Sequence, residues 1–247
     1  MIFKKNKNTV KEYLDITFVA KDEFIAEATQ APVPARTLVP DWYKDMSTHR
    51  TKTPDFDEHF GNQNTTFKAC MPFFDSWTFG YVAVTPCDLV VEVGFDENDI
   101  KIHGNKIFDL IGYRGAPNKH SMPIPDDYYQ LEFTWQTHWE AQTPDGYSSF
   151  YTHPINRPEL PFYTISGVMD TDKWYATGNH PFFLKKGFEG IIPMGTPMMS
   201  IIPFKRDTWK SDKRSMRPME YDVLNSKVRR HASSGYKKEM WQRKDFS

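Results

Sequence analysis

The chain has 247 residues, 39% of them hydrophobic and 15% aromatic, so it can bury a sizeable core and is too apolar to be disordered. Its net charge of −1 and pI of about 6.7 exclude a general attraction of the whole molecule to nucleic acid or anionic membranes. The two cysteines, Cys70 and Cys87, form no Cys-x-x-C pair and argue against a disulfide framework or a structural zinc site.

The first half of the chain predicts short strands joined by loops. Apolar runs rich in β-branched and aromatic residues predict strands at residues 13–20, 67–74, 77–84, 89–93 and 100–103. The Pro-rich segment 31–40 should lie extended along a surface, and Pro40 suits the first turn of a short helix over 41–46. Loops are expected at residues 47–66 and 112–127.

The clearest predicted strand covers residues 129–140. Its apolar residues alternate with polar ones, which is the period of a strand and excludes a helix. The residues expected in the core are Leu131, Phe133 and Trp135. Those expected to point away from it are Glu132, Thr134 and Gln136.

Residues 139–209 continue this β pattern. Proline and glycine interrupt short apolar runs at intervals of roughly ten residues, the spacing of a barrel or sandwich of short strands. No apolar run reaches the length of a membrane span, and the basic start at 1–7 lacks the apolar region of a signal peptide. We therefore expect the protein in the cytoplasm of the producing cell.

The end of the chain differs in both charge and period. Residues 205–247 carry thirteen Lys and Arg against six Asp and Glu, a net +7, which leaves −8 on residues 1–204. Tyr221, Leu224 and Val228 recur at helical spacing. We call residues 211–247 the basic tail. Its candidate interaction residues are Lys227, Arg229, Arg230, Lys237, Lys238 and Trp241.

The central stretch carries an ordered series of short motifs. They are TPDGYS at 143–148, LPF at 160–162, SGVMDTD at 166–172, GTP at 195–197 and IPFKRDTW at 202–209. This order resembles an uncharacterised family of bacterial and phage proteins. The resemblance implies a phage-associated setting and no particular activity.

A shorter series is similar to trimeric dUTPases and dCTP deaminases. It consists of GYSS at 146–149, GVMD at 167–170, KG at 186–187 and GTP at 195–197, before a last apolar strand. The resemblance implies a β-clip barrel, with Asp170 as the carboxylate that activates water and Ser148 or Ser149 as the phosphate contact.

The chain departs from that pattern at three places. Lys173 stands where a dUTPase has the tyrosine that stacks on the base, and Tyr147 stands where it has an arginine. The basic tail replaces the glycine-rich aromatic arm that closes over the phosphates.

Asp170 and Asp172 form a paired-carboxylate motif, but Asp-Thr-Asp after a strand is also typical of a turn that caps its own backbone. Arg206 either binds an anion or ends a solvated strand.

A metal site is the second chemical alternative. His138 and Glu140 are two apart on the predicted strand, so an imidazole and a carboxylate on one side could share a metal ion, as in cupin-like iron enzymes. His153 or His180 would supply the further ligand. The competing interpretation is that this is simply the polar face of the strand.

The combined prediction is an all-β fold, a β-clip-like barrel or a β-sandwich, with a short N-terminal helix and a C-terminal helical tail. Residues 1–210 form one β domain with a Pro-rich N-terminal extension, and the basic tail follows. The predicted function is that of a non-catalytic structural or interaction protein, phage-associated as a virion or assembly component, without a cofactor or membrane partner. Its partners would be proteins, including a second copy of itself, with nucleic acid as an alternative ligand of the tail.

The alternative function is a barrel enzyme that acts on a small molecule. It would be a dUTPase-like hydrolase using Asp170, Asp172, Ser148 and Ser149, or a cupin-like metal-dependent oxygenase using His138, Glu140 and His180.

Overall fold

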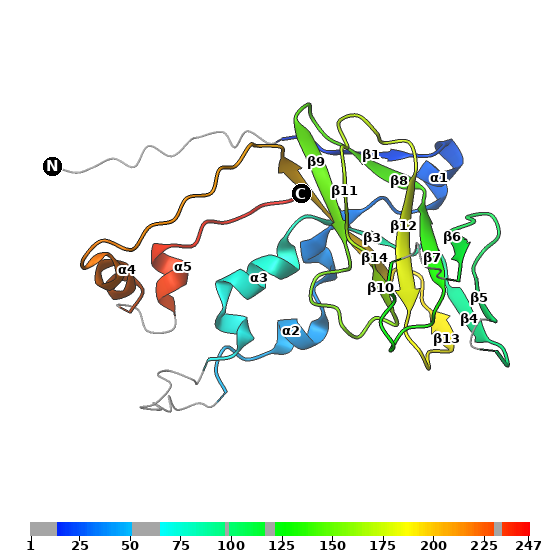
Figure 1. Cartoon of the computed structure of the whole chain (residues 1–247), viewed down its shortest axis with the longest axis horizontal. Coiled ribbons are helices and arrows are strands. Elements are labelled where there is room, and N and C mark those ends of the chain that lie inside the picture. The colour runs from blue at the N-terminus through cyan, green and yellow to red at the C-terminus, as the bar shows by residue number, and fades with distance from the viewer. Residues whose placement is uncertain (1–13, 51–64, 97–98, 117–121, 230–233) are drawn as a thin grey trace.

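The computed structural model describes residues 14–50, 65–96, 99–116, 122–229 and 234–247, and most of its regular structure is β (Figure 1). Its strands are β1 (Thr17–Ala20), β2 (Val33–Pro34), β3 (Tyr81–Val84), β4 (Leu89–Val93), β5 (Ile100–His103), β6 (Ile111–Gly115), β7 (Glu132–Thr137), β8 (Trp139–Gln142), β9 (Tyr147–Thr152), β10 (Phe162–Thr164), β11 (Gly167–Met169), β12 (Gly178–Leu184), β13 (Gly190–Ile192) and β14 (Pro197–Lys205). Its α-helices are α1 (Glu23–Ala28), α2 (Asp41–Asp45), α3 (Met71–Thr78), α4 (Glu220–Arg229) and α5 (Gly235–Glu239), and its 3-10 helices are η1 (Ala35–Leu38) and η2 (Phe67–Ala69). The mostly β class with short helices near both ends is confirmed.

The strands of the described residues form four antiparallel sheets. Their orders are β11-β9-β14-β3-β2, β10-β12-β7-β6, β13-β4-β5 and β1-β8. β9 and β14 pair over six residues at the centre of the largest sheet. Because β9 also pairs with β11 and β14 also pairs with β3, both strands are hydrogen-bonded along both edges.

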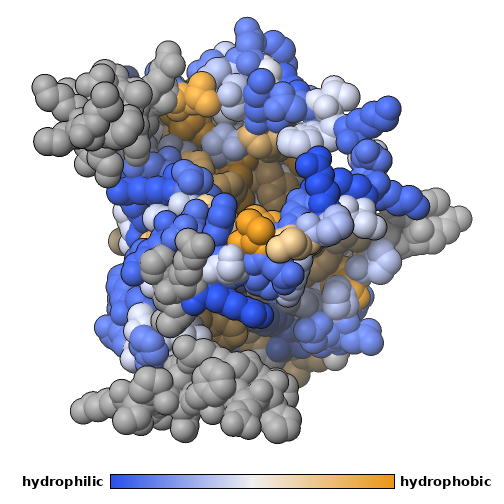
Figure 2. Space-filling model, turned by 90° about the vertical axis from the view of Figure 1, so that its left-hand side faces the viewer, coloured by the Kyte–Doolittle hydropathy of each residue, from blue (hydrophilic) through white to orange (hydrophobic). Residues whose placement is uncertain are grey.

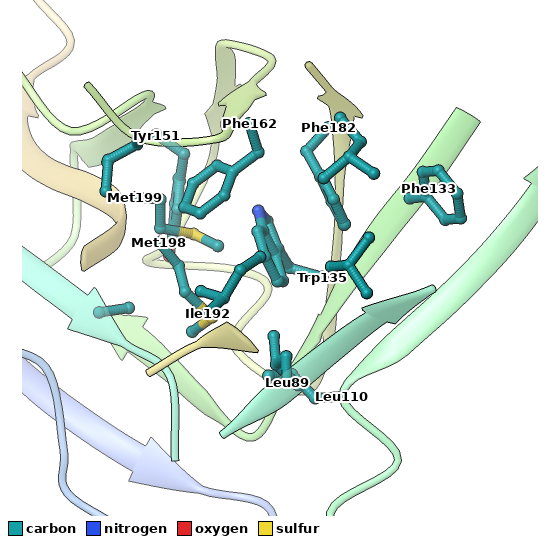
Figure 3. Close-up of a cluster of buried hydrophobic side chains, with 14 of the residues drawn as sticks. Leu89, Leu110, Phe133, Trp135, Tyr151, Phe162, Phe182, Ile192, Met198 and Met199 are labelled. Carbon is teal, nitrogen blue, oxygen red and sulfur yellow. The ribbon is translucent and has the colours of Figure 1, made fainter. Parts of the chain in front are cut away.

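One hydrophobic core joins all four sheets, and Trp135 lies near its middle (Figure 3). The Trp135 ring stacks on Phe182 with centroids 3.9 Å apart and meets the edge of Phe162 at 5.0 Å. Its indole nitrogen donates to Thr164 Oγ1 over 3.0 Å, so the polar atom of this buried ring is satisfied. The predicted core residues Leu131, Phe133 and Trp135 are all buried, as expected.

The predicted strand over 129–140 is broken in the structure. β7 ends at Thr137, the chain bends at His138, and β8 begins at Trp139. Because the bend resets the alternation, Glu140 is buried and Trp139 is only half-buried, the reverse of what the uninterrupted period predicts. Thr134 is also buried, which corrects its expected position away from the core.

The predicted strand over 67–74 is wrong, because this segment is helical. Thr66 caps η2 by accepting a hydrogen bond from the amide of Lys68, and Pro72 lies in the first turn of α3. Phe73 and Trp77, four residues apart on α3, pack against Tyr43 of α2. The same helix takes the first residues of the predicted strand over 77–84, of which β3 keeps the second half.

Several other elements differ from the prediction in extent. β6 lies in part of the expected loop 112–127, and α1 occupies a segment with no predicted element. The Pro-rich segment is extended at β2 and then turns into η1, while the short helix predicted after Pro40 is confirmed as α2. Most of the expected loop 47–66 lies outside the described residues.

The basic tail leaves the β body and returns to it. After β14, residues 207–219 are all exposed and contain no helix or strand; we call them the linker. α4 and α5 stand away from the sheets, and the last residues run back to the body (Figure 1). Gly235 begins α5 against the carbonyl of Val228, where an added Cβ would lie 1.6 Å from that oxygen. The division of the chain near residue 210 into domain and tail stays a prediction.

Candidate functional site

Three strand ends bring the predicted Ser148 and Asp170 together at one edge of the largest sheet. Ser148 lies on β9, which pairs with β11 on one side and β14 on the other. Asp170 follows β11 and Arg206 follows β14, so both approach Ser148. The Ser148 hydroxyl donates to Asp170 Oδ1 over 2.7 Å, and Arg206 Nη1 donates to the Ser148 hydroxyl over 3.0 Å.

Arg206 is the centre of this cluster. Its guanidinium donates from both terminal nitrogens to Asp172, and Nη1 to Asp172 Oδ1 spans 2.8 Å. The same Nη1 also donates to the carbonyl of Tyr147 over 2.8 Å and lies 3.3 Å from Asp170 Oδ1. The sequence leaves two roles open for Arg206, binding of an anion or a solvated strand end. In the structure its anionic partners are carboxylates of the protein itself, Asp172 and Asp170.

Asp172 is held as an ionised carboxylate. Its side chain is only 1% exposed, and the hydrogen bonds from Arg206 hold its pKa well below the usual range. The amide of Gly146 adds a further donor to Asp172 Oδ2 at 2.9 Å. Such a carboxylate is a poor proton acceptor, because its charge is already compensated. The competing interpretation is a turn that caps its own backbone, whereas the partners of Asp172, Arg206 and Gly146, come from other segments of the chain.

The fourth predicted residue of this set lies apart. Ser149 is buried, and its hydroxyl lies 3.0 Å from that of Thr171. Asp170 remains the exposed member, with a side chain 63% exposed. The structure therefore gathers Ser148, Asp170 and Asp172 around Arg206, and directs Ser149 into the protein.

We expect Arg206→Gln to lower stability at neutral pH, because Asp172 then loses its guanidinium partner inside the fold. A depressed pKa contributes stability above the pKa of the unfolded chain, about 4, and that contribution is lost as the pH falls. The difference between wild type and Arg206→Gln in urea melts should therefore shrink below about pH 4. Arg214→Gln is the matched control, since Arg214 pairs with Glu220 beside the exposed linker. An equal loss for both variants would contradict this role of Arg206.

The second predicted set contains a buried acid and a buried imidazole. Glu140 accepts from the hydroxyl of Thr137, and the Tyr151 hydroxyl lies 3.3 Å from its Oε2. His180 stacks on the Tyr151 ring with centroids 4.6 Å apart, and its Nε2 lies 4.0 Å from Glu140 Oε1. Gly178 lies directly against this group. A Cβ at that position would lie 2.3 Å from His180 Nε2 and 2.5 Å from Glu140 Oε1, which is too close for a larger residue.

Burial shifts both of these titrating groups toward their neutral forms. It raises the pKa of Glu140 from 4.5 to about 7, although hydrogen bonds from Thr137 and Tyr151 act in the other direction. It lowers the pKa of His180 from 6.5 to about 4. At neutral pH the imidazole is therefore uncharged, and no hydrogen bond from a described residue reaches its Nε2.

His138 does not join Glu140 and His180. Because the chain bends between β7 and β8, the side chains of His138 and Glu140 do not share one side of a strand. The His138 ring lies near Phe108, with centroids 6.4 Å apart. Within the described part of the chain, no three His, Cys, Asp or Glu side chains gather closely enough to hold a metal ion. His153 accepts at Nδ1 from the amide of Thr164, and its Nε2 contacts the carbonyl of Arg157, so both of its nitrogens serve the fold.

The predicted interaction residues of the basic tail fall into two groups. Lys227, Arg229, Lys237 and Lys238 are exposed, and Arg230 lies outside the described residues. Trp241 instead docks on the body, where its indole nitrogen donates to both carboxylate oxygens of Asp75 over 3.0 and 2.9 Å. Sequence reasoning did not find Asp75, because 166 residues separate it from Trp241.

The apolar stripe of α4 is largely uncovered. Tyr221 is 60% and Leu224 42% exposed, while Val228 on the same face is half-buried near α5. Figure 2 views the molecule from the side of this tail and shows apolar side chains set among mostly hydrophilic ones. The helix therefore presents apolar side chains that contacts within the chain leave open to solvent.

Comparison with known proteins gives little further information. No family model matches the sequence, and no curated protein matches it. Among solved structures, the chain is similar to the dUTPase from phage phi11 of S. aureus. A mutant that coordinates a structural Mg(II) ion is 10% identical, with 57% of this chain and 84% of that chain covered and a TM-score of 0.30. A second structure, which shows a species-specific insert, is 12% identical, with 44% and 97% covered and a TM-score of 0.26.

A likeness at these identities and TM-scores transfers neither an activity nor a residue role to this chain. None of the described helices is long and apolar enough to cross a bilayer.

Proposed function

We propose that the protein is a non-catalytic assembly protein that binds a protein partner, a second copy of itself, through the basic tail. The observation that carries the proposal is the exposed stripe of α4, with Tyr221 and Leu224 on one face and both open to solvent. Neighbouring exposed apolar side chains on one short helix are typical of a surface that another protein covers.

The length of α4 supports the same conclusion. It has ten residues, and isolated helices of that length are marginal in water. Its main contact with another described element is with α5, near Val228 and Gly235. Covering Tyr221 and Leu224 would add the apolar burial that a helix of this size needs.

The charges favour a partner with an acidic surface. The chain from residue 205 carries +7 and the remainder −8, so the tail of one copy and the body of another attract each other. Lys227 and Arg229 are exposed beside the apolar stripe and are placed to meet acidic groups. Because exposed charges are screened over about 8 Å at physiological ionic strength, this association should weaken with added salt.

The bonding of the candidate catalytic groups also favours binding over catalysis. Asp172 is neutralised by Arg206, and Glu140 and His180 are buried within the sheets. The motif order that resembles bacterial and phage proteins supports a phage-associated setting, as a virion or assembly component.

The test is a substitution that charges the stripe. Leu224→Glu should weaken self-association by at least about tenfold, since burying one leucine contributes roughly 1.5–3 kcal/mol. Ser226→Glu adds the same charge at an exposed polar position of α4 and should change association much less. Sedimentation velocity over a range of concentrations measures both. A wild-type chain that stays monomeric at every concentration would overturn the proposal.

The enzymatic alternative has its own readout. We expect no pyrophosphate release from dUTP with magnesium, and no stoichiometric iron or zinc in the purified protein. Pyrophosphate release that Asp170→Asn abolishes would establish the nucleotide hydrolase instead. Bound metal that is lost on His138→Ala would establish the metal enzyme.

A further inference from the structure

The last seven residues, 241–247, form a strap that docks on the body at two separate points. The first point is Asp75 on α3. Trp241 donates its indole N–H to this carboxylate, and Lys244 Nζ lies 2.7 Å from Asp75 Oδ2. The Asp75 side chain is only 15% exposed, so the strap covers an acidic group that would otherwise face solvent.

The second point is an aromatic contact beside the core. Phe246 meets Phe79 and Tyr81 edge-on, with centroids 5.2 and 5.9 Å apart, and packs against the main hydrophobic cluster. The Tyr81 hydroxyl donates to the carbonyl of Ser247 over 3.3 Å. The end of the basic tail thus packs against the hydrophobic core of the β body.

Between these two points Asp245 of the strap pairs with Arg36 of η1, with Nη1 and Oδ1 3.1 Å apart. An open cleft of about 600 Å³ adjoins the second point, where Phe246 and Ser247 also line it, and its body side includes Ile16, Tyr81 and Pro203. Arg243 and Asp245 line it on the strap side. A strap that borders an open cleft on one side can detach by losing the limited set of contacts to Asp75, Arg36, Phe79 and Tyr81.

The linker lets the detached strap travel. Its thirteen residues, 207–219, are all exposed, and an extended chain of that length spans at most about 45 Å. α4 and α5 stand away from the sheets between the linker and the strap (Figure 1). The strap can therefore reach the same docking surface on a neighbouring molecule.

We propose that the strap exchanges between copies, so that in the assembled form the strap of one chain docks on Asp75, Phe79 and Tyr81 of a second chain. The inference rests on the proposed function for the identity of the partner and adds the mode of binding. The docking surface already fits this segment, so the contacts made within one chain are remade between two. Exchange also brings the exposed stripe of α4 next to a second molecule, where it can be covered.

The experiment uses two single-cysteine chains that differ in mass through a tag. Both carry Cys70→Ser and Cys87→Ser; one adds Arg36→Cys and the other Asp245→Cys. Arg36 Nη1 and Asp245 Oδ1 lie 3.1 Å apart, and this pair leaves Trp241 and Phe246 in place. The chains are co-expressed, and the assembled fraction is treated with a short bismaleimide crosslinker.

We expect a crosslinked heterodimer several-fold above the level of a control pair, Lys101→Cys with Asp245→Cys, in which Lys101 is exposed on β5, away from the strap, and reports random collision. A single chain with both Arg36→Cys and Asp245→Cys should give the intrachain product when dilute. Intrachain product alone, in an assembly that Leu224→Glu still disrupts, would overturn strap exchange and leave the proposed function standing. A chain that never assembles would overturn the proposed function instead.

Discussion

Trp135→Ala is expected to lower the free energy of unfolding by about 3–5 kcal/mol, the range for truncating a large aromatic in a core. The Trp135 ring is fully buried and packs on Phe182 and Phe162 from two other strands. Its loss leaves a cavity where the sheets meet. It also removes the indole donor from the hydroxyl of Thr164.

Trp209→Ala is the matched control, because the same side chain is 88% exposed in the linker. Urea melts of both variants and the wild type measure the difference. We expect Trp209→Ala to stay within about 0.5 kcal/mol of wild type, as exposed substitutions usually do. Similar losses for the two tryptophans would mean that Trp135 does not hold the sheets together.

Glu140→Gln is expected to stabilise the protein relative to wild type at alkaline pH. Burial raises the pKa of Glu140 from 4.5 to about 7. Below the lower value the carboxyl is protonated in both the folded and unfolded chains. Between the two values only the unfolded chain loses the proton, so wild-type stability falls as the pH rises. Above the higher value the penalty is constant, at about 3 kcal/mol for this shift.

The measurement is the free energy of unfolding of both proteins at about pH 4, 6 and 8. The advantage of Glu140→Gln should grow across this series and level off near its end. His180, the neighbour of Glu140, is present in both proteins. The effect of its titration on the difference in the free energy of unfolding therefore largely cancels. Glu132→Gln on β7 removes one negative charge from a half-buried position and reports the effect of net charge. A pH-independent difference for Glu140→Gln would show that this carboxylate is not desolvated in the fold.

The spacing of apolar residues in the sequence predicted one strand of the core and the helix α4 correctly. The alternation around Leu131, Phe133 and Trp135 identified a strand and its buried face, because successive side chains of a strand point to opposite sides. The helical spacing of Tyr221 and Leu224 identified α4 in the same way. Each of these two patterns is carried by residues only a few positions apart, so no knowledge of the tertiary structure was needed.

Errors arose where a local signal was ambiguous or interrupted. The aromatic run at 67–74 suits a strand by composition, yet the cap at Thr66 and the packing of Phe73 and Trp77 on Tyr43 make it helical. At His138 one bend shifts the register, and Glu140 therefore points into the protein. A period of two predicts a face only as long as the strand continues.

The sequence by itself determined the mostly β class, the buried face of the 132–137 strand and the separate basic, helical character of the tail. Only the tertiary structure decided the surroundings of the chemical groups. Arg206 meets Asp172 across 34 residues, and Trp241 meets Asp75 across 166. Such pairs depend on which strands adjoin and where the chain end returns. Composition and spacing carry no information about these long-range placements, and the role of each carboxylate follows from them.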